Sequence, residues 1–228
     1  MSAPLGARHT VQAVLFDMDG TLVDTEPYWM SAEYQLVAEF GGTWNDEHAH
    51  ELVGNDLLTS ARYLRDVGGV DLDPAVIVDR MLDSVIVDVR RQMPWRPGAR
   101  ELLAECVDAA VPCAMVTMSY TRLADALVEQ LPVGTFAAVV TGDQVATGKP
   151  DPEAYRTACE RLGVRPGDSV AIEDSPTGIA SAMAAGCVVV GVPHRVPIHA
   201  APGRTLVGSL ADLTVASLDA LVARNVTA

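Results

Sequence analysis

The chain has 228 residues, of which 49% are hydrophobic, so it can form one large domain or a domain with an insertion. Its formal net charge of −14, without a cluster of Lys and Arg, excludes the usual classes of nucleic-acid-binding protein. No apolar run is long enough to span a membrane, and residues 1–10 lack the apolar core of a signal peptide. We therefore expect a cytoplasmic protein that contacts neither nucleic acid nor membrane.

The first apolar run, residues 11–16, leads into the motif Asp17-Met18-Asp19-Gly20-Thr21-Leu22-Val23-Asp24. Such a run before a glycine turn predicts a buried strand of a parallel sheet, and these sheets bind ligands at their carboxyl ends. Residues two apart point the same way in extended chain, so Asp17 and Asp19 can share one site. Two adjacent carboxylates favour a bound cation, and oxygen ligands suit Mg²⁺. A surface turn with two aspartates explains this motif equally well when it is taken alone.

The segment after this motif is predicted to be entirely helical. The motif Asp-Thr-Glu-Pro at 24–27 predicts a helix start. Helices are expected at residues 28–40, 45–52, 57–67 and 74–92, with no strand-like run between them. The sequence Met93-Pro94-Trp95-Arg96-Pro97-Gly98 has two prolines and a glycine, which indicates a linker. We therefore expect residues 25–93 to form a helical cap inserted between the two parts of a core, residues 1–24 and 94–228.

After the linker, helical and strand-like runs alternate. Helices are predicted at 99–110, 120–130, 152–162, 176–185 and 215–223, and strands at 111–117, 137–141, 169–173, 187–192 and 205–207. Strands that alternate with helices imply a parallel sheet with right-handed crossovers. The predicted fold class is α/β, a Rossmann-like parallel-sheet core with an inserted all-helical cap domain.

Three further predicted strands end in polar residues. Thr117 offers a hydroxyl to a phosphate oxygen, although a helix start capped by Ser119 or Thr121 explains this stretch as well. Lys149 is held between Gly148 and a proline just before a helix start, where its charge can offset that of a phosphate. Glu173 and Asp174 follow another strand and can complete a metal shell with the first aspartates, or complement a helix dipole.

The order of these motifs resembles the haloacid dehalogenase-like hydrolase superfamily. The resemblance rests on the Asp17–Asp24 motif, on Gly-Lys-Pro-Asp-Pro at 148–152, and on Ile-Glu-Asp-Ser-Pro-x-Gly at 172–178, and it covers nearly the whole chain. The helical block directly after the first motif is similar to the cap of the beta-phosphoglucomutase-like and phosphoglycolate phosphatase-like branch. The resemblance implies a Mg²⁺-dependent phosphatase that acts on a small phosphorylated metabolite.

The resemblance also implies a role for each motif residue. Asp17 would attack phosphorus to form an aspartyl-phosphate, and Asp19 would protonate the leaving alkoxide and then deprotonate water. The phosphoryl oxygens would be held by four residues: Thr117, Lys149, Gly20 and Met118. The metal would be held by Asp17, by the backbone carbonyl of Asp19 and by Asp174, with Glu173 binding it directly or orienting a ligand.

The cap residues bear on the choice between a phosphatase and a mutase. Mutases of this branch have a His five residues after the cap-entry Asp and an Arg in a Gly-x-Ser-Arg loop, where this chain has Trp29 and Leu57. Both departures favour a sugar-phosphate phosphatase over the alternative, a beta-phosphoglucomutase-like mutase; a non-catalytic binding protein on the same fold is a second alternative. The candidates for contact with the leaving group are Trp29, Gly54, Asn55 and Asp56, and Trp29 is equally explained as cap core. Monomer and weak homodimer both remain open.

Overall fold

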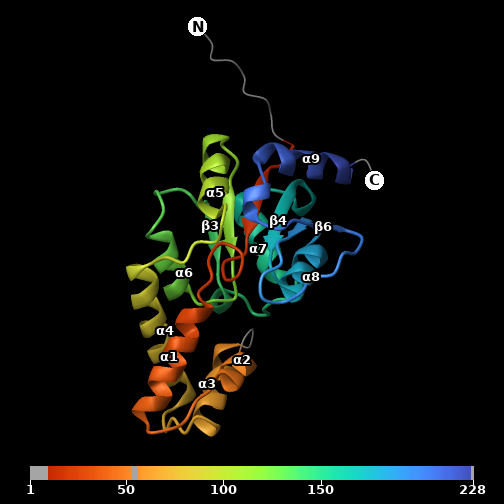
Figure 1. Cartoon of the computed structure of the whole chain (residues 1–228). Helices are drawn as coiled ribbons and strands as arrows, with labels where there is room; N and C mark the ends of the chain where they lie inside the picture. Colours follow the sequence, from red (N-terminus) through yellow and green to blue (C-terminus); the bar gives the residue numbers. More distant parts are fainter. Residues whose placement is uncertain (1–9, 53–55, 227–228) are drawn as a thin grey trace.

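The computed structural model describes residues 10–52 and 56–226, and its core is built on one parallel sheet (Figure 1). The sheet has the order β3-β2-β1-β4-β5-β6. Its strands are β1 (Ala13–Phe16), β2 (Cys113–Val116), β3 (Ala138–Val140), β4 (Ser169–Glu173), β5 (Val188–Gly191) and β6 (Arg204–Leu206). In register, Phe16 faces Met115 on β2 and Ile172 on β4, so these three strands end at one level. The residues that follow them therefore meet at one edge of the sheet.

Helices cover both faces of this sheet. They are α5 (Ala99–Asp108), α6 (Thr121–Val128), α7 (Glu153–Leu162), α8 (Pro176–Ala185) and α9 (Val215–Val226). Along β1, Val14 and Phe16 join an apolar cluster with α5, α6 and α9, while Ala13 and Leu15 join a second cluster with α7 and α8. Burial on both faces explains why β1 is apolar at every position.

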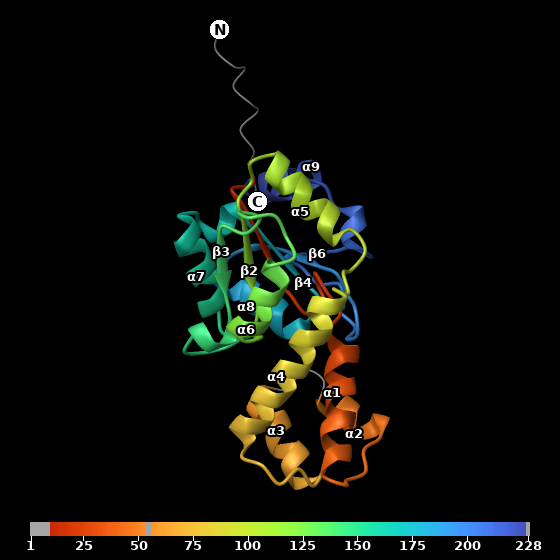
Figure 2. The same cartoon turned by 90° about the vertical axis from the view of Figure 1, so that its left-hand side faces the viewer.

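The remaining helices form a separate group at the carboxyl edge of the sheet (Figure 2). They are α1 (Glu26–Glu39), α2 (Asp46–Leu52), α3 (Leu57–Asp66) and α4 (Pro74–Arg91). Helix α4 begins where the Asp73 side chain accepts a hydrogen bond from the Ala75 amide, and it packs against α1 and α3. None of the described helices is long and apolar enough to cross a membrane.

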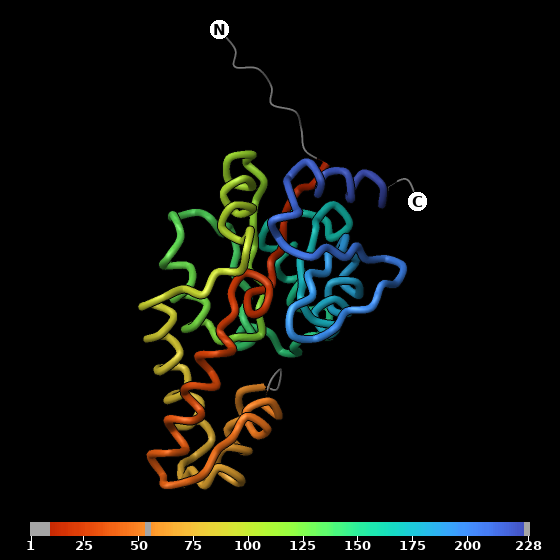
Figure 3. The backbone as a smooth tube through the Cα atoms, viewed as in Figure 1, coloured from red at the N-terminus to blue at the C-terminus, as the bar shows by residue number. Residues whose placement is uncertain are grey.

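Two adjacent linkers join the cap helices to the core (Figure 3). Val23 forms an antiparallel bridge with Trp95, and the Asp24 amide donates to the Pro94 carbonyl at 3.0 Å. The C-terminal half of α4 packs against the core helix α6, where Arg90 pairs with Glu129 at 3.0 Å. The expected division at residues 24/25 and 93/94 stays a prediction, because α4 contacts both parts.

The predicted helices and strands are each found within about three residues of the expected bounds. The sequence patterns did not predict three short 3₁₀ helices, η1 (Gly142–Gln144), η2 (Pro166–Asp168) and η3 (Leu210–Asp212). Single turns of this kind carry no apolar periodicity, which is why pattern analysis misses them.

Candidate active site

The acidic residues after β1 and β4 come together at the carboxyl edge of the sheet. Asp17 donates its amide to the Ile172 carbonyl at 3.0 Å, which sets the end of β1 beside the end of β4. One carboxylate oxygen each from Asp17, Glu173 and Asp174 lies within 4.8 Å of the others. Asp17 and Glu173 are buried and Asp174 is half-buried. Three carboxylates this close repel one another unless positive charge is near.

Lys149 supplies that charge, and it is the only lysine in the sequence. Its ammonium donates to Asp17 Oδ1 at 2.7 Å, to Glu173 Oε1 at 2.6 Å and to the Val116 carbonyl at 2.9 Å. The side chain is only 6% exposed. Although burial lowers the pKa of Lys149, the charges of Asp17 and Glu173 raise it overall, so the ammonium stays protonated.

Glu173 is saturated with hydrogen bonds. Besides Lys149, the Tyr155 hydroxyl donates to its Oε1 at 2.8 Å and the Ser175 hydroxyl donates to its Oε2 at 3.1 Å. Gly178 makes this packing possible, since a Cβ there would overlap the Glu173 carboxylate. Both oxygens therefore have partners within the protein, and Glu173 is placed to orient Lys149.

Asp19 faces a different set of partners. Its carboxylate accepts hydrogen bonds from the hydroxyls of Thr25, at the cap entry, and Ser119, the latter at 2.6 Å. Burial raises the pKa of Asp19, while these two hydrogen bonds act in the opposite direction. A carboxyl with a raised pKa suits a proton donor. Ser119 was predicted only as a possible helix cap; its place two residues after Thr117, at a strand end, was the available signal.

The predicted phosphate-binding residues lie around the same edge. Thr117 is buried, and its hydroxyl oxygen accepts a hydrogen bond from the Ser119 amide at 3.0 Å, which leaves its proton available to a ligand. Met118 Sδ accepts a hydrogen bond from the Lys149 amide at 3.2 Å. Gly20 has φ of 87°, and a Cβ at this position would overlap the Asp174 carboxylate. A side chain here would thus block the approach of Asp174.

The donor set fits a hard divalent cation. Asp17 Oδ2 is buried and has no hydrogen-bond partner among the described residues. Burial, and next the charge of Glu173, raise the pKa of Asp174 to about 7. A divalent cation beside Asp17 and Asp174 would satisfy the unpaired oxygen and lower both pKa values. Carboxylate oxygens are the ligands that Mg²⁺ prefers.

Comparison with known proteins settles the family. The profile of the haloacid dehalogenase-like hydrolase family matches residues 14–192. The chain belongs to this family. It is 33% identical to hexitol phosphatase A of Escherichia coli, over 78% of this chain and 81% of the relative. It is also 33% identical to the phosphorylated carbohydrates phosphatase of Thermotoga maritima, over 81% and 86% of the two chains.

A solved structure confirms the predicted fold of this haloacid dehalogenase-like hydrolase. The crystal structure of CbbY from Rhodobacter sphaeroides in complex with phosphate matches with a TM-score of 0.80 and 31% identity. The match covers 92% of this chain and 99% of that chain. The family and the Rossmann-like core with a helical cap are therefore confirmed.

The cap residues of this family member are less closely tied to the acidic centre. Trp29 is half-buried and packs against the large apolar cluster, and Leu57 does the same. Asp56 caps α3 by accepting a hydrogen bond from the Thr59 amide at 3.0 Å. Gly54 and Asn55 lie outside the described residues. Their contact with a leaving group stays a prediction, as does that of Trp29 and Asp56.

One cap residue near the site was not predicted. Glu26, in the first turn of α1, is half-buried. Burial raises its pKa, the Arg195 guanidinium lowers it, and the Asp19 carboxylate raises it further. Glu26 therefore lies close enough to Asp19 for their charges to interact. The motif Asp-Thr-Glu-Pro at 24–27 was interpreted only as a helix start, so the interaction of Glu26 with Asp19 was not predicted.

Proposed function

We propose that the protein hydrolyses the monophosphate ester of a small sugar or polyol, with Mg²⁺ bound and through a phosphate carried on Asp17. The prediction of a phosphoric monoester hydrolase is confirmed by the family and by relatives named as phosphatases. The proposed mechanism rests on the arrangement of two acids. Lys149 contacts Asp17, while the second acid, Asp19, accepts its hydrogen bond from Ser119 instead.

In the first step the Asp17 carboxylate attacks phosphorus, and the bond from phosphorus to the ester oxygen breaks. Asp19, whose pKa burial raises, acts as the general acid and gives its proton to the departing alkoxide. Lys149 and the Thr117 hydroxyl hold phosphoryl oxygens and offset their charge. The product of this step is an acyl phosphate on Asp17 and a free alcohol.

In the second step Asp19, now ionised, removes a proton from water, whose oxygen attacks the phosphorus on Asp17. The acyl–phosphate bond breaks, inorganic phosphate leaves, and Asp17 is restored as a carboxylate. The Thr25 and Ser119 hydroxyls orient Asp19 for both proton transfers. Since Thr25 lies at the cap entry, the position of the cap and the orientation of Asp19 are linked through one hydrogen bond.

Asp17 and Asp174 would hold Mg²⁺, together with the backbone carbonyl of Asp19, while Glu173 acts through Lys149. When bound, the ion supplies positive charge that offsets the repulsion between carboxylate and phosphate. The unpaired Asp17 Oδ2 and the close approach of Asp174 over Gly20 support this assignment.

Hydrolysis fits this chain better than a mutase reaction, which must hold a second phosphate. Residues 25–93 contain thirteen Asp and Glu but only five Arg and no Lys. Leu57 stands where mutases of this branch have an arginine, and it packs against the apolar cluster. An acidic cap disfavours a second phosphate group and suits an uncharged polyol. The substrate is therefore proposed to be a monophosphate. We also propose that the protein works in the cytoplasm.

The test is phosphate release from a panel of sugar phosphates, polyol phosphates and nucleoside monophosphates. We expect release with Mg²⁺, loss of release with EDTA, and recovery when Mg²⁺ is returned. The panel includes beta-glucose 1-phosphate with trace bisphosphate, and formation of glucose 6-phosphate with little free phosphate would instead establish a mutase. Release that persists after exhaustive chelation would contradict the metal assignment.

A further inference from the structure

A groove lies at the junction of the two linkers, apart from the acidic centre. It is open to solvent, offers a volume of about 600 Å³, and is lined by Tyr28, Trp95, Arg96, His194, Asp24 and three prolines. Neither Asp17, Asp19, Lys149 nor Asp174 lines it. The groove is therefore a second concave surface whose chemistry is separate from that of the catalytic residues.

Arg96 brings a positive charge to this groove, although the chain as a whole is strongly acidic. The half-buried Arg96 has no hydrogen-bond or ion-pair partner for its guanidinium in the part of the chain that the structure describes. Asp24, the one acid in the lining, is already paired with Arg195, whose Nη2 lies 3.0 Å from each of its oxygens. His194 Nε2 lies 3.2 Å from the same carboxylate. Arg96 is thus left to bind an anion from outside the protein.

The rest of the lining is apolar and flat. Tyr28 and Trp95 are both half-buried, and prolines 27, 94 and 97 stand beside them. Aromatic rings and proline rings offer rigid surfaces to a planar ligand at little entropic cost. A guanidinium next to such surfaces selects a compact anion that carries a planar apolar body, rather than a bare inorganic ion.

The groove also touches both linkers of the cap and one loop of the core. Tyr28 belongs to α1, Trp95 and Arg96 follow α4, and His194 comes from the core loop after β5. The Tyr28 hydroxyl donates to the Gln92 carbonyl at 2.8 Å, which ties cap entry to cap exit. A ligand in the groove would contact both linkers and the core at once. Such a ligand would favour whichever cap position leaves the groove intact.

We propose that the linker groove binds a small organic anion with a planar apolar body, its acidic group paired with Arg96 and its body against Tyr28 and Trp95. A ligand bound there contacts both linkers and does not compete for the catalytic residues. The binding site does not depend on the proposed phosphatase activity.

The probe for this site is 8-anilinonaphthalene-1-sulfonate, which joins one sulfonate to planar rings. We expect Arg96→Gln to weaken its binding at least about fivefold in a fluorescence titration, an effect of the size of one lost charge-assisted contact. Arg96→Lys keeps the charge and should retain most of the affinity. The matched control is Arg91→Gln, which removes an exposed arginine from the last turn of α4 outside the groove and should change the affinity less than about twofold.

Two further measurements distinguish binding in this groove from binding at other surfaces of the protein. Saturating inorganic phosphate should leave the affinity for the sulfonate unchanged, and uncharged N-phenyl-1-naphthylamine should bind more weakly than the sulfonate. Equal affinities in wild type, Arg96→Gln and Arg91→Gln would overturn the proposal, and so would displacement of the probe by phosphate. Binding is measured without turnover, so failure of the proposed phosphatase activity would not be mistaken for failure here. Thermal melts confirm that each variant is folded.

Discussion

At the carboxyl edge of the sheet, Lys149 touches three partners and Glu173 accepts bonds from three side chains, whereas Trp29 and Asp56 in the cap serve packing and helix capping. The core edge is fixed by a network of hydrogen bonds in which Asp17 Oδ2 is the one buried carboxylate oxygen without a partner among the described residues. The cap instead presents an acidic surface with few bonds to the site. The reacting groups therefore gather at the core edge, and we expect the cap to select the leaving group.

The largest effect should come from the core residue that forms the covalent bond. Asp17→Asn keeps the volume but removes the nucleophilic charge, so we expect kcat to fall by about 10⁴-fold or more. The measurement is steady-state phosphate release, with a thermal melt to show that the fold is kept. The control is Asp125→Asn, an exposed carboxylate on α6, which should keep normal turnover. Near-normal turnover in Asp17→Asn would break the assignment of chemistry to the core.

Loss of the lysine should damage both activity and stability. Lys149→Gln leaves Asp17 and Glu173 buried without their counter-charge, which should cost roughly 3–5 kcal/mol of unfolding free energy. Urea unfolding measures this cost, and phosphate release should fall in parallel. In the double variant with Glu173→Gln part of the lost stability should return, because one buried charge is removed. Additive losses would argue that Lys149 and Glu173 act independently.

A smaller effect is expected at the link between Asp19 and the neighbouring strand. Ser119→Ala removes the hydroxyl that donates to Asp19 at 2.6 Å, so the general acid is oriented by Thr25 alone. We expect kcat to fall about 10-fold, equivalent to about 1.4 kcal/mol, with little change in KM. A change confined to KM would place Ser119 in substrate binding instead.

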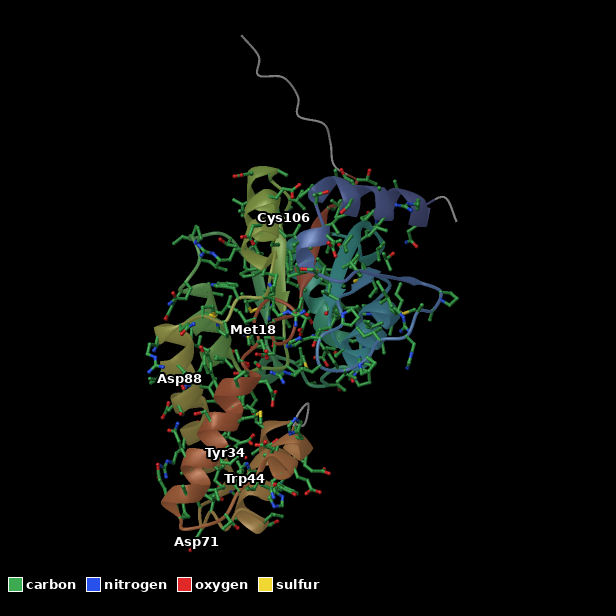
Figure 4. All side chains as sticks on the ribbon, in the orientation of Figure 1. Met18, Tyr34, Trp44, Asp71, Asp88 and Cys106 are labelled. Carbon is green, nitrogen blue, oxygen red and sulfur yellow. The ribbon has the colours of Figure 1, made fainter. Side chains whose placement is uncertain are left out.

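The smallest effect on turnover is expected from the interior of the cap. Trp44 lies among the cap helices (Figure 4) and donates a hydrogen bond to Glu33 at 3.3 Å. Glu33 is 4% exposed, and burial raises its pKa to about 8. The folded state therefore binds this proton more tightly than the unfolded state, so the contribution to stability is complete below about pH 4.5 and is lost as pH rises through 8.

Glu33→Gln should remove this pH dependence while keeping an acceptor for Trp44. We expect the variant to match wild type near pH 5 and to be more stable than wild type near pH 8, as measured by urea unfolding at both values. Turnover at pH 5 should be unchanged, since the cap interior does not touch the reacting groups. A variant that is less stable than wild type at pH 8 would contradict the assignment of a neutral Glu33.

Much of the core could be predicted from the sequence because its signals are local. Apolar runs that end in Gly, Pro or acidic residues mark strand ends, and parallel topology brings those ends together. What the pattern does not contain is contact between distant positions. Lys149 bonds to Asp17 across 132 residues of sequence, and its bond to Glu173 makes that residue an orienting group. Ser119 was missed for the same reason, because its bond to Asp19 depends on register.

The cap was harder to predict in detail, although its helices were found. Asp56 caps α3 and Trp29 packs against neighbours, and both roles follow from three-dimensional packing that a short motif cannot specify. Glu26 was interpreted only as part of a helix start, yet α1 places it near Asp19. Contacts with a leaving group depend on the cap position and on the unknown substrate, so no sequence pattern determines them.

The most direct test of the central claim is to look for the phosphate on Asp17. The enzyme is mixed with a substrate identified by the panel, quenched in acid within milliseconds, digested, and analysed by mass spectrometry. We expect one phosphoryl group on the peptide that contains Asp17, sensitive to hydroxylamine and missing from Asp17→Asn. A phosphoryl group on another residue, or full turnover with no acyl phosphate at any quench time, would contradict it.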